Sequence, residues 1–240
     1  MTPPAELLPW DSEFFGVRVA RALDTDAFGP GDGRVLLKWC EAHRVRWLYA
    51  LLPPNPSAIQ EAEASGFALT DVRVALAGPP ERIAGGPVGN IRPFRDADLP
   101  VLRRLARASH RDSRFFADPH VPEGRAELLF ERWIERDCSA DPNGWAGVAE
   151  SGSAPAGYLT AHVDNQRRGW IRLVAVAADA RGQGLGAALV AAAGRWFVER
   201  GAVEVHVVTQ GRNLAAQRVY QQAGFRTETV RLWYHRWFLQ

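Results

Sequence analysis

The stretch ARGQGLGAALV, residues 180–190, decides the fold, because it places an arginine and three glycines before a run of small apolar residues and leucine. That much glycine makes a poor strand and a poor helix start, unless the backbone must come close to something. The preceding residues, WIRLVAVAAD (170–179), are rich in β-branched and aromatic residues and predict a strand. The following residues, GAALVAAAGRWFVERG (186–201), have a helical apolar pattern that ends at Gly201.

The glycines therefore lie in a strand-to-helix turn, and such a turn predicts an anion site. Backbone N–H groups in the first turn of a helix have no partner within the helix and lie at the positive end of its dipole. Phosphate is the anion that suits such a turn best. Two common phosphate loops do not fit RGQGLG (181–186), since it lacks the Lys-Ser/Thr pair of a P-loop and does not follow Gly-x-Gly-x-x-Gly.

Two motifs resemble the signatures of the GNAT acyltransferases, which bind acetyl-coenzyme A (acetyl-CoA). Arg-x-x-Gly-x-Gly at residues 181–186 resembles the pyrophosphate loop of that family. The second motif follows a predicted strand at 203–209 and begins a predicted helix that Asn213 is well placed to cap. It resembles the family's second signature at Asn213, Ala216, Tyr220, Gly224 and Phe225. The resemblance implies an α/β protein with the mixed central sheet of the GNAT fold.

The same resemblance implies which residues form the site. Tyr220 would be the general acid that protonates the coenzyme thiolate, since an unperturbed tyrosine, with a pKa near ~10, holds its proton at neutral pH. Backbone N–H groups around Val174 to Val176 would meet the thioester carbonyl, where the family parts two parallel strands. The residues expected to contact acetyl-CoA are Val174, Ala175, Val176, Arg181, Gly182, Gln183, Gly184, Leu185, Gly186, Asn213 and Ala216.

Other candidate residues are left without a role. His162 and His206 both fall in predicted strands, where a histidine is more often structural than catalytic. An amine of modest pKa would need only water, so the general base is left unassigned. Cys40 and Cys138 fall in predicted helices and are expected to be inert thiols. No metal is expected at the site.

Length and composition set limits on the protein class. With 240 residues, 47% of them hydrophobic, the chain is long enough for one large or two small globular domains. A formal net charge of +2, with arginines scattered along the sequence, gives no basic footprint for nucleic acid. No stretch approaches the ~20 apolar residues of a membrane span, and MTPPAELLPWDSEFF does not resemble a signal peptide. These features predict a cytoplasmic protein with no nucleic-acid or membrane partner, and a homodimer is left open.

The sequence also contains an internal repeat. The stretch from Val35 to Leu76 has the same predicted order as the C-terminal signature: helix, strand, helix, Gly-Phe, strand. We interpret residues 1–88 as a truncated GNAT-like domain and residues 89–240 as the catalytic domain, with GPPERIAGGPVG (78–89) as the linker. The first copy has FGPGDG (28–33) in place of RGQGLG and Ala62 in place of Tyr220, so only the second copy is expected to be active. The alternative is that this order of elements recurs by chance.

A finer resemblance concerns the acceptor. Phe-x-x-Asp-Pro-x-x-Pro at residues 115–122 and LPWDSEFFG at residues 8–16 are similar to segments of the bacterial TDP-fucosamine N-acetyltransferases. That family acetylates the 4-amino group of a deoxysugar carried on thymidine diphosphate, with coenzyme A and without metal. The resemblance implies a small-molecule acceptor, a nucleotide-linked amino sugar. The side chains expected to serve its diphosphate and rings are Arg111, Arg114, Arg167, Arg168, Phe115, Phe116 and Trp170.

Two other functions are compatible with the sequence. A GNAT acetyltransferase for a protein N-terminus or an aminoglycoside would use the same donor half, and would predict an acidic acceptor groove. A non-catalytic acyl-CoA-binding protein would have lost either Tyr220 or the loop glycines, and this chain keeps both. The sequence does not name the sugar, the nucleotide or the oligomeric state.

Overall fold

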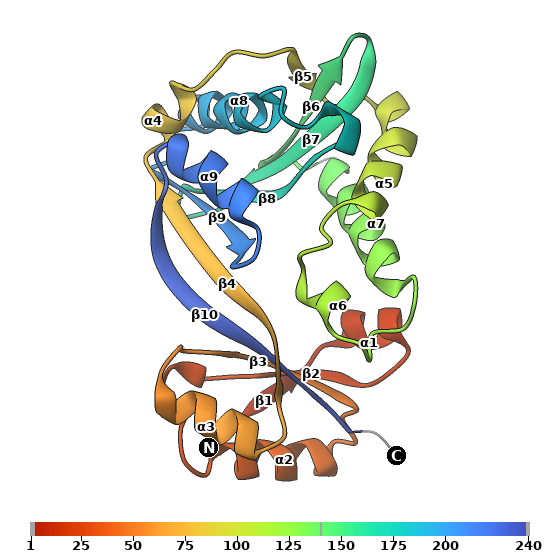
Figure 1. Ribbon diagram of the computed structural model, residues 1–240, viewed down its shortest axis with the longest axis vertical. Helices are drawn as coiled ribbons and strands as arrows, with labels where there is room; N and C mark the ends of the chain where they lie inside the picture. The colour runs from red at the N-terminus through yellow and green to blue at the C-terminus, as the bar shows by residue number, and fades with distance from the viewer. Residues whose placement is uncertain (1–2, 140, 239–240) are drawn as a thin grey trace. The chain divides into compact units, whose positions relative to one another are not determined.

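The computed structural model describes residues 3–139 and 141–238 and divides the chain into two units. The first unit consists of Met1–Arg73, Asp112–Arg125 and Val230–Gln240, and the second of Val74–Arg111 and Ala126–Thr229. Two long strands, β4 (Ala68–Gly78) and β10 (Arg226–Trp237), contribute residues to both units (Figure 1).

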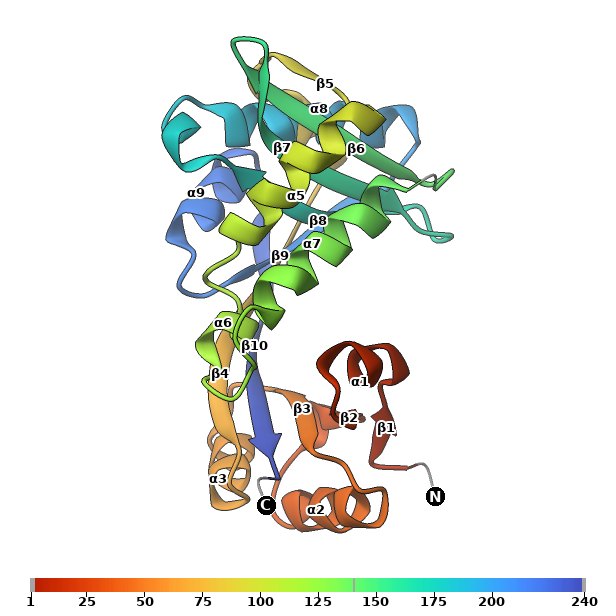
Figure 2. The ribbon, with the colours of Figure 1, turned by 90° about the vertical axis from the view of Figure 1, so that its right-hand side faces the viewer.

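The second unit is a mixed sheet with helices on both faces. Its strands follow the spatial order β10, β4, β9 (Glu204–Gln210), β8 (Arg168–Val176), β7 (Ala154–Val163), β6 (Gly144–Ser151) and β5 (Ile91–Pro93). Strands β5 to β8 pair antiparallel, whereas β8 and β9 pair in parallel. The helices are α4 (Pro80–Ala84), α5 (Leu99–Ala108), α7 (Arg125–Cys138, all but its first residue), α8 (Leu185–Glu199) and α9 (Leu214–Gln222). Figure 2 shows α5 and α7 in front of strands β6 to β8, with α8 behind them. The strand predicted at 170–179 is confirmed to within three residues at each end.

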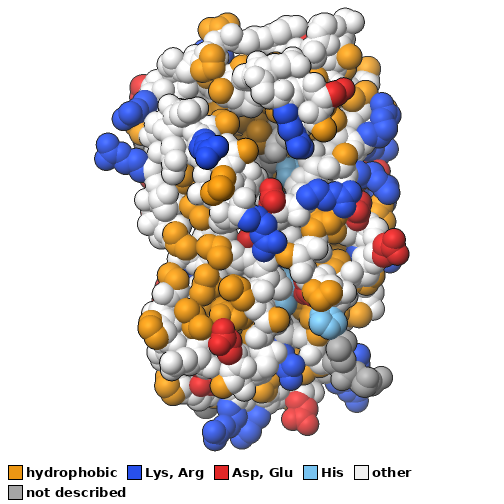
Figure 3. Space-filling model, viewed as in Figure 1, with side chains coloured by type: hydrophobic (Ala, Val, Ile, Leu, Met, Phe, Trp, Pro, Cys, Tyr) orange, Lys and Arg blue, Asp and Glu red, His pale blue; other side chains and the backbone are white. Residues whose placement is uncertain are grey.

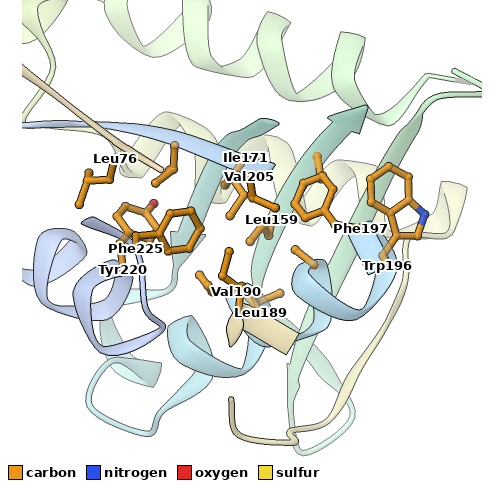
Figure 4. Packing of buried hydrophobic residues seen from close by; sticks show 14 of the residues in the cluster. Leu76, Leu159, Ile171, Leu189, Val190, Trp196, Phe197, Val205, Tyr220 and Phe225 are labelled. Carbon is orange, nitrogen blue, oxygen red and sulfur yellow. The ribbon is translucent and has the colours of Figure 1, made fainter. Parts of the chain in front are cut away.

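The core of the second unit lies between the sheet and α8. On β8 and β9, side chains alternate between this core and the opposite face, as strands with one buried face require. Ile171 of β8 and Val205 of β9 face the core, and they pack with Leu189, Val190 and Phe197 of α8 (Figure 4). On each strand, the side chains that alternate with these core residues therefore lie on the opposite face. We call this face the open face of β8 and β9.

The segment 78–89, predicted to be a linker, is partly built into the second unit. Pro80 begins α4, whose Ile83 is fully buried in the same core. A Cβ on Gly194 of α8 would lie 2.5 Å from the backbone nitrogen of Ala84, so glycine lets the two helices approach closely. Arg195 also donates a hydrogen bond to the Ala84 carbonyl oxygen, at 3.2 Å. The linker prediction is therefore wrong for α4, because a buried isoleucine and a close helix contact fix it in place.

The strands of the first unit belong to the same sheet and are also mixed in direction. They follow the order β1 (Ala5–Leu7), β2 (Val19–Ala22), β3 (Trp47–Leu52), β10 and β4. Strand β2 pairs in parallel with β3, and β3 pairs antiparallel with β10 from Leu52 opposite Leu232 to Trp47 opposite Trp237. The helices are α1 (Pro9–Phe15), α2 (Asp32–Ala42), α3 (Pro56–Ala64) and α6 (Arg114–Ala117).

Strand β3 separates two different layers in the first unit. Leu48 packs into an aliphatic core with Leu36 and Cys40 of α2, and burial raises the pKa of the Cys40 thiol to about 12, which fits an inert thiol. Its neighbours Trp47 and Tyr49 face the other side, where they join an aromatic layer. The alternation of apolar side chains along WLYALL thus serves two cores at once.

The units do not follow the boundary predicted at residues 88 and 89. Contacts place residues 74–88 in the second unit and residues 112–125 and 230–240 in the first. The predicted boundary came from internal similarity rather than contacts, and it remains a prediction. Among the residues that the structure describes, no helix has both the length and the apolar character needed to cross a membrane. On the face in Figure 3, Lys and Arg side chains are dispersed, with Asp and Glu among them.

Candidate functional site

The glycine turn of the second unit is open to close approach by a ligand. Gly182 and Gly184 both have φ of +77°, a conformation that glycine adopts without the strain of a side chain. A Cβ placed on Gly182, Gly184 or Gly186 would meet no heavy atom within 4 Å. The space beside this backbone is therefore not filled by the protein, as a loop that receives a phosphate requires.

The start of α8 supplies unpaired donors to this turn. Gly184 is the N-cap residue, no side chain caps the helix, and the Ala188 N–H donates to the Gly184 carbonyl at 3.0 Å. The N–H groups of Leu185, Gly186 and Ala187 therefore have no partner within the helix and lie at its positive end. Arg181 is exposed, and its Nε donates to the Val176 carbonyl at 3.3 Å. This set of donors fits a pyrophosphate.

Strands β8 and β9 part just before the turn. They pair from Arg168 opposite Glu204 to Ile171 opposite Val207, although β8 continues to Val176. Leu173 N–H donates toward β7, to Thr160 Oγ1 at 3.1 Å, and Ala177 N–H donates to the Ala156 carbonyl at 2.7 Å. Because successive N–H groups of a strand point to opposite sides, those of Val174 and Val176 point to the side where β9 has moved away. Two backbone donors at such an opening suit the oxygen of a thioester carbonyl.

A β-bulge, which the sequence analysis missed, accompanies this opening. Thr160 pairs with Leu173 and the next residue pairs with Ile171, so Arg172 is the extra residue of β8. The buried Thr160 hydroxyl accepts from Leu173 N–H and donates to Asp137 Oδ2 at 2.9 Å. Arg172 also contacts Asp137, at 3.4 Å. A threonine within a strand is too common to signal such a bulge in advance.

Tyr220 is buried on α9 with its hydroxyl available. The side chain is 5% exposed, and its ring packs edge-on against Phe225 with centroids 5.7 Å apart (Figure 4). Burial raises the pKa of the Tyr220 phenol above its ordinary value, so the hydroxyl keeps its proton at neutral pH. Among the described residues, none forms a hydrogen bond with this hydroxyl. A protonated hydroxyl without a protein partner can donate to a ligand.

Asn213 and Ala216 are involved in capping α9. The Asn213 side chain accepts a hydrogen bond from Ala216 N–H at 3.1 Å, as the sequence predicts for an N-cap. Gln217, which the sequence analysis did not single out, donates to the carbonyls of Gln210 and Gly211 at 3.0 and 2.9 Å. These bonds hold the connection between β9 and α9. The coenzyme contacts predicted for Asn213 and Ala216 remain predictions.

The segment expected to serve the acceptor belongs to the first unit, where Arg114 lies in an aromatic cage. Its guanidinium carbon lies 4.3, 4.1 and 4.3 Å from the ring centroids of Tyr49, Phe115 and Trp233. Its Nη1 lies 2.9 Å from Nε2 of His235. Because arginine can only donate, His235 must accept at Nε2 and carry its proton on Nδ1.

Asp118 completes this chain of hydrogen bonds. The His235 Nδ1–H donates to Asp118 Oδ2 at 2.6 Å, and Trp237 Nε1–H donates to the same oxygen at 2.8 Å. Burial lowers the pKa of His235 to about 4, so the ring is neutral at pH 7. Burial alone would raise the pKa of Asp118, but the bonds from His235 and Trp237 bring it down to about 2. These hydrogen bonds therefore hold the Arg114 and Asp118 side chains in place within the first unit.

The arginines expected to bind a diphosphate each have a protein partner already. Arg111 pairs with Glu127 at 2.8 Å and Arg168 with Asp164 at 2.9 Å, within the second unit. Arg167 donates to the Gly201 carbonyl at 2.8 Å, and Arg114 bonds to His235. Phe115 is 4% exposed, so it is a packing residue, whereas Trp170 is half-buried. Each of the four guanidinium groups therefore already has a partner within its own unit: a carboxylate for Arg111 and Arg168, a backbone carbonyl for Arg167 and His235 for Arg114.

No group of three or more His, Cys, Asp or Glu side chains within residues 3–139 and 141–238 is arranged to hold a metal ion. Of the two strand histidines, His162 lies with Nδ1 3.0 Å from Asp141 Oδ2. His206 lies on the open face of β9, stacked on Trp170 of β8 with ring centroids 4.7 Å apart. The sequence could not tell these two histidines apart, and their surroundings now do.

Comparison with known proteins gives the same family as the site geometry. Residues 103–225 match the acetyltransferase (GNAT) family. The dTDP-fucosamine acetyltransferase of Escherichia coli O6:H1 is 27% identical over 234 residues, which cover 96% of this chain and 97% of that protein. The mycothiol acetyltransferase of Mycolicibacterium paratuberculosis is 29% identical over 252 residues, covering 96% of this chain and 75% of that protein.

Among solved structures, a tandem GNAT protein from the clavulanic acid biosynthesis pathway has a similar fold. Its TM-score is 0.60 at 16% identity, with 92% of this chain and 76% of that chain covered. The fold class predicted from the sequence, a GNAT fold preceded by a truncated GNAT-like unit, is confirmed. The chain belongs to the GNAT family and is an acyl-CoA-dependent N-acetyltransferase.

Proposed function

We propose that this N-acetyltransferase transfers the acetyl group of acetyl-CoA to the amino group of a nucleotide-linked amino-deoxysugar, a thymidine diphosphate 4-amino-deoxyhexose. The observation that carries the proposal is the similarity to a dTDP-fucosamine acetyltransferase along nearly the full length of both chains. The segments 8–16 and 115–122, which carry the finer resemblance, are outside the donor half.

Contacts within the first unit support a joint role for these two segments. The rings of Phe15 and Phe115 stack with centroids 5.9 Å apart, and Arg125 lies over the ring of Phe14 at 5.7 Å. Burial raises the pKa of Asp11 while the Arg114 charge opposes the rise, so the two charged groups also interact. The stack of Phe15 on Phe115 thus joins the two segments that carry the finer resemblance, and Arg114 and Arg125, which flank the second segment, interact with the first.

The donor half is proposed to work through residues of the second unit. Acetyl-CoA supplies the acetyl group and a thiolate leaving group. The N–H groups of Leu185 and Gly186 would bind the pyrophosphate, together with the side chain of Arg181. The N–H groups of Val174 and Val176 would stabilise the negative charge that develops on the carbonyl oxygen. Tyr220 would give its proton to the departing sulfur.

A second candidate is a different small-molecule amine. The similarity to a mycothiol acetyltransferase extends over the same share of this chain, and it favours an acceptor related to mycothiol. A protein N-terminus or an aminoglycoside has no comparable support among these relatives. The four arginines expected to bind the diphosphate do not favour the nucleotide, since each has a protein partner. They are Arg111, Arg114, Arg167 and Arg168.

An acceptor panel separates the two candidates. Thiol release from acetyl-CoA is followed with free amino sugars, their thymidine diphosphate forms, a mycothiol precursor amine, a peptide and an aminoglycoside. We expect the highest kcat/KM with a nucleotide-linked amino sugar, because binding energy from the remote nucleotide can orient the reacting amine. Equal kcat/KM for the free sugar would contradict the proposal and leave the acetyltransferase activity intact. We also propose that the reaction takes place in the cytoplasm and needs no metal, so added chelator should leave the rate unchanged.

A further inference from the structure

The second unit contains three histidines, and two of them have fixed partners. His110 lies with Nε2 2.9 Å from the Tyr158 hydroxyl and is stacked on Phe130, and burial lowers its pKa to about 4. His162 pairs with Asp141 at 3.0 Å. His206 differs from both, because its buried Nε2 forms no hydrogen bond with any described residue.

Two carboxylates and an indole ring surround the His206 side chain. Its side chain is 12% exposed and lies between two carboxylates, 3.2 Å from Glu204 and 3.7 Å from Glu228. The distance to Glu204 is short, but the oxygen lies outside the direction of a hydrogen bond. Trp170 covers one face of the imidazole, and the Arg168 guanidinium lies 5.6 Å from the centre of that indole on β8. Two carboxylates therefore flank the ring nitrogens.

His206 lies on β9 just before the point where β8 and β9 separate. His206 is the Cα partner of Trp170, one residue before the last pair that β8 and β9 form. Val174, whose N–H points into the opening, lies four residues beyond Trp170, a span of about 13 Å at ~3.3 Å per residue. A general base must lie within hydrogen-bond reach of the proton that it removes, directly or through one water molecule. A role for His206 in proton transfer therefore requires that the acceptor amine bind between these two levels.

We propose that His206 is the general base that removes a proton from the acceptor ammonium. The imidazole takes this proton, the freed lone pair forms the N–C bond to the acetyl carbonyl, and the C–S bond breaks with its electron pair on sulfur. Tyr220 protonates that sulfur, and the second proton of the nitrogen returns to the Tyr220 phenolate as the amide forms. Over one turnover the ammonium loses two protons, of which one ends on the thiol and the other reaches solvent through His206. The inference rests on the N-acetyltransferase activity and does not depend on which amine is the natural acceptor.

The test is a pH profile of kcat/KM for the parent and His206→Gln, with the best amine of the acceptor panel. At pH 7 the variant should lose ~10²–10⁴-fold, the usual contribution of a general base. The loss should shrink as pH rises, because the acceptor then arrives already as the free amine. His162→Gln is the matched control, a strand histidine beside a carboxylate, and it should keep the parent profile.

Two results would overturn the proposal. One is a kcat/KM for His206→Gln within threefold of the parent at pH 7, and the other is a deficit that is the same at every pH. Calorimetric titration with coenzyme A shows whether the variant is folded. If it is not, the double variant Glu204→Gln/Glu228→Gln replaces it, since both carboxylates are about half exposed. That variant removes both negative charges beside the ring and should change the pH profile of kcat/KM, and an unchanged profile would exclude His206 as the base.

Discussion

The first and second units contain similar capped helices and similar glycine turns. Comparing them shows what a coenzyme site requires beyond the fold. In the first unit Asn55 caps α3 by accepting from Ala58 N–H at 2.9 Å, and in the second Asn213 caps α9 by accepting from Ala216 N–H at 3.1 Å. Both helices are nine residues long. At the end of α3, Phe67 N–H donates a hydrogen bond to the Ala62 carbonyl. At the end of α9, Phe225 N–H donates one to the Tyr220 carbonyl, and both bonds are 3.0 Å long.

The glycine turns also correspond. Gly31 is the N-cap of α2 with φ of +93°, as Gly184 is the N-cap of α8 with φ of +77°. The difference lies in what surrounds them. The N–H of Gly33, the counterpart of Gly186, donates to Glu61 Oε1 at 3.0 Å, and a Cβ on Gly33 would lie 1.8 Å from the Ser65 hydroxyl oxygen.

In the first copy, then, the protein's own side chains occupy the place of an anion. The Glu61 carboxylate meets the start of α2, and Asp32 accepts from Gly29 N–H at 2.9 Å. Pro30 removes one N–H donor that Gln183 keeps in the second copy. The same turn can therefore serve as a ligand site or as a closed structural joint, and the neighbouring side chains decide which.

The largest effect should follow from filling the open turn. Gly184→Val adds a β-branched side chain where the pyrophosphate must reach the backbone, at a φ that costs about 1–2 kcal/mol for a residue with a Cβ. We expect the Kd for coenzyme A to rise by more than ~100-fold in titration calorimetry. The matched control is Gly31→Val, which has a similar φ in the closed turn. It should lose stability but keep coenzyme affinity, and equal binding by Gly184→Val would remove the turn from the site.

The next effect concerns the position where Ala62 and Tyr220 differ. Tyr220→Phe keeps the ring against Phe225 and removes only the hydroxyl proton. kcat should fall ~10²–10⁴-fold, or about 3–5 kcal/mol in activation free energy, while coenzyme Kd stays near that of the parent. Tyr234→Phe, at another buried tyrosine, serves as the control and should leave kcat unchanged. A kcat for Tyr220→Phe within threefold of the parent would rule out the acid role.

The features that could be predicted from the sequence are those that depend on local backbone demands. Glycines at positive φ, the Asn213 cap and the helix that carries Tyr220 are each specified by a few adjacent residues. The order of these elements then identified the fold. No local sequence pattern predicts that β8 and β9 separate after Ile171. That expectation came from the family resemblance alone.

The features that could not be predicted depend on contacts between distant residues. Asp118 and His235 are 117 positions apart, and Thr160 and Asp137 are 23 apart. No periodicity links such pairs, so Arg114 was expected to face a ligand and instead lies among three rings. Likewise, the burial of Ile83 depends on Gly194 of α8, and the composition of residues 78–89 alone suggests a linker.

A third prediction tests whether both units lose folding stability at acidic pH. Burial lowers the pKa of His110 in the second unit and of His235 in the first to about 4, against ~6.5 in an unfolded chain. Between these values the unfolded chain binds more protons, so stability is lost as pH falls from about 6.5 to about 4. At ~1.4 kcal/mol per pKa unit, each histidine accounts for about 3 kcal/mol.

Urea unfolding at several pH values from 7 to 4.5 measures this loss. His235→Asn keeps a donor for Asp118 and an acceptor for Arg114 but does not titrate in this range, so it should remove about half of the pH dependence. His110→Asn should remove the other half. Parent stability that is constant over the range would contradict both assignments.

The smallest effect should come from opening the closed turn. Glu61→Ala leaves the buried Gly33 N–H without its charged acceptor, which should lower the free energy of unfolding by about 1–3 kcal/mol in urea titrations. Glu61→Gln keeps an acceptor oxygen and should lose less. Neither variant should change the stoichiometry of coenzyme A binding from one, because Phe28 stands where the second copy has Arg181 and Pro30 still lacks an N–H. A second binding event in Glu61→Ala would mean that the carboxylate alone keeps the first copy from binding, and the two turns would then differ by one side chain rather than by their backbone donors.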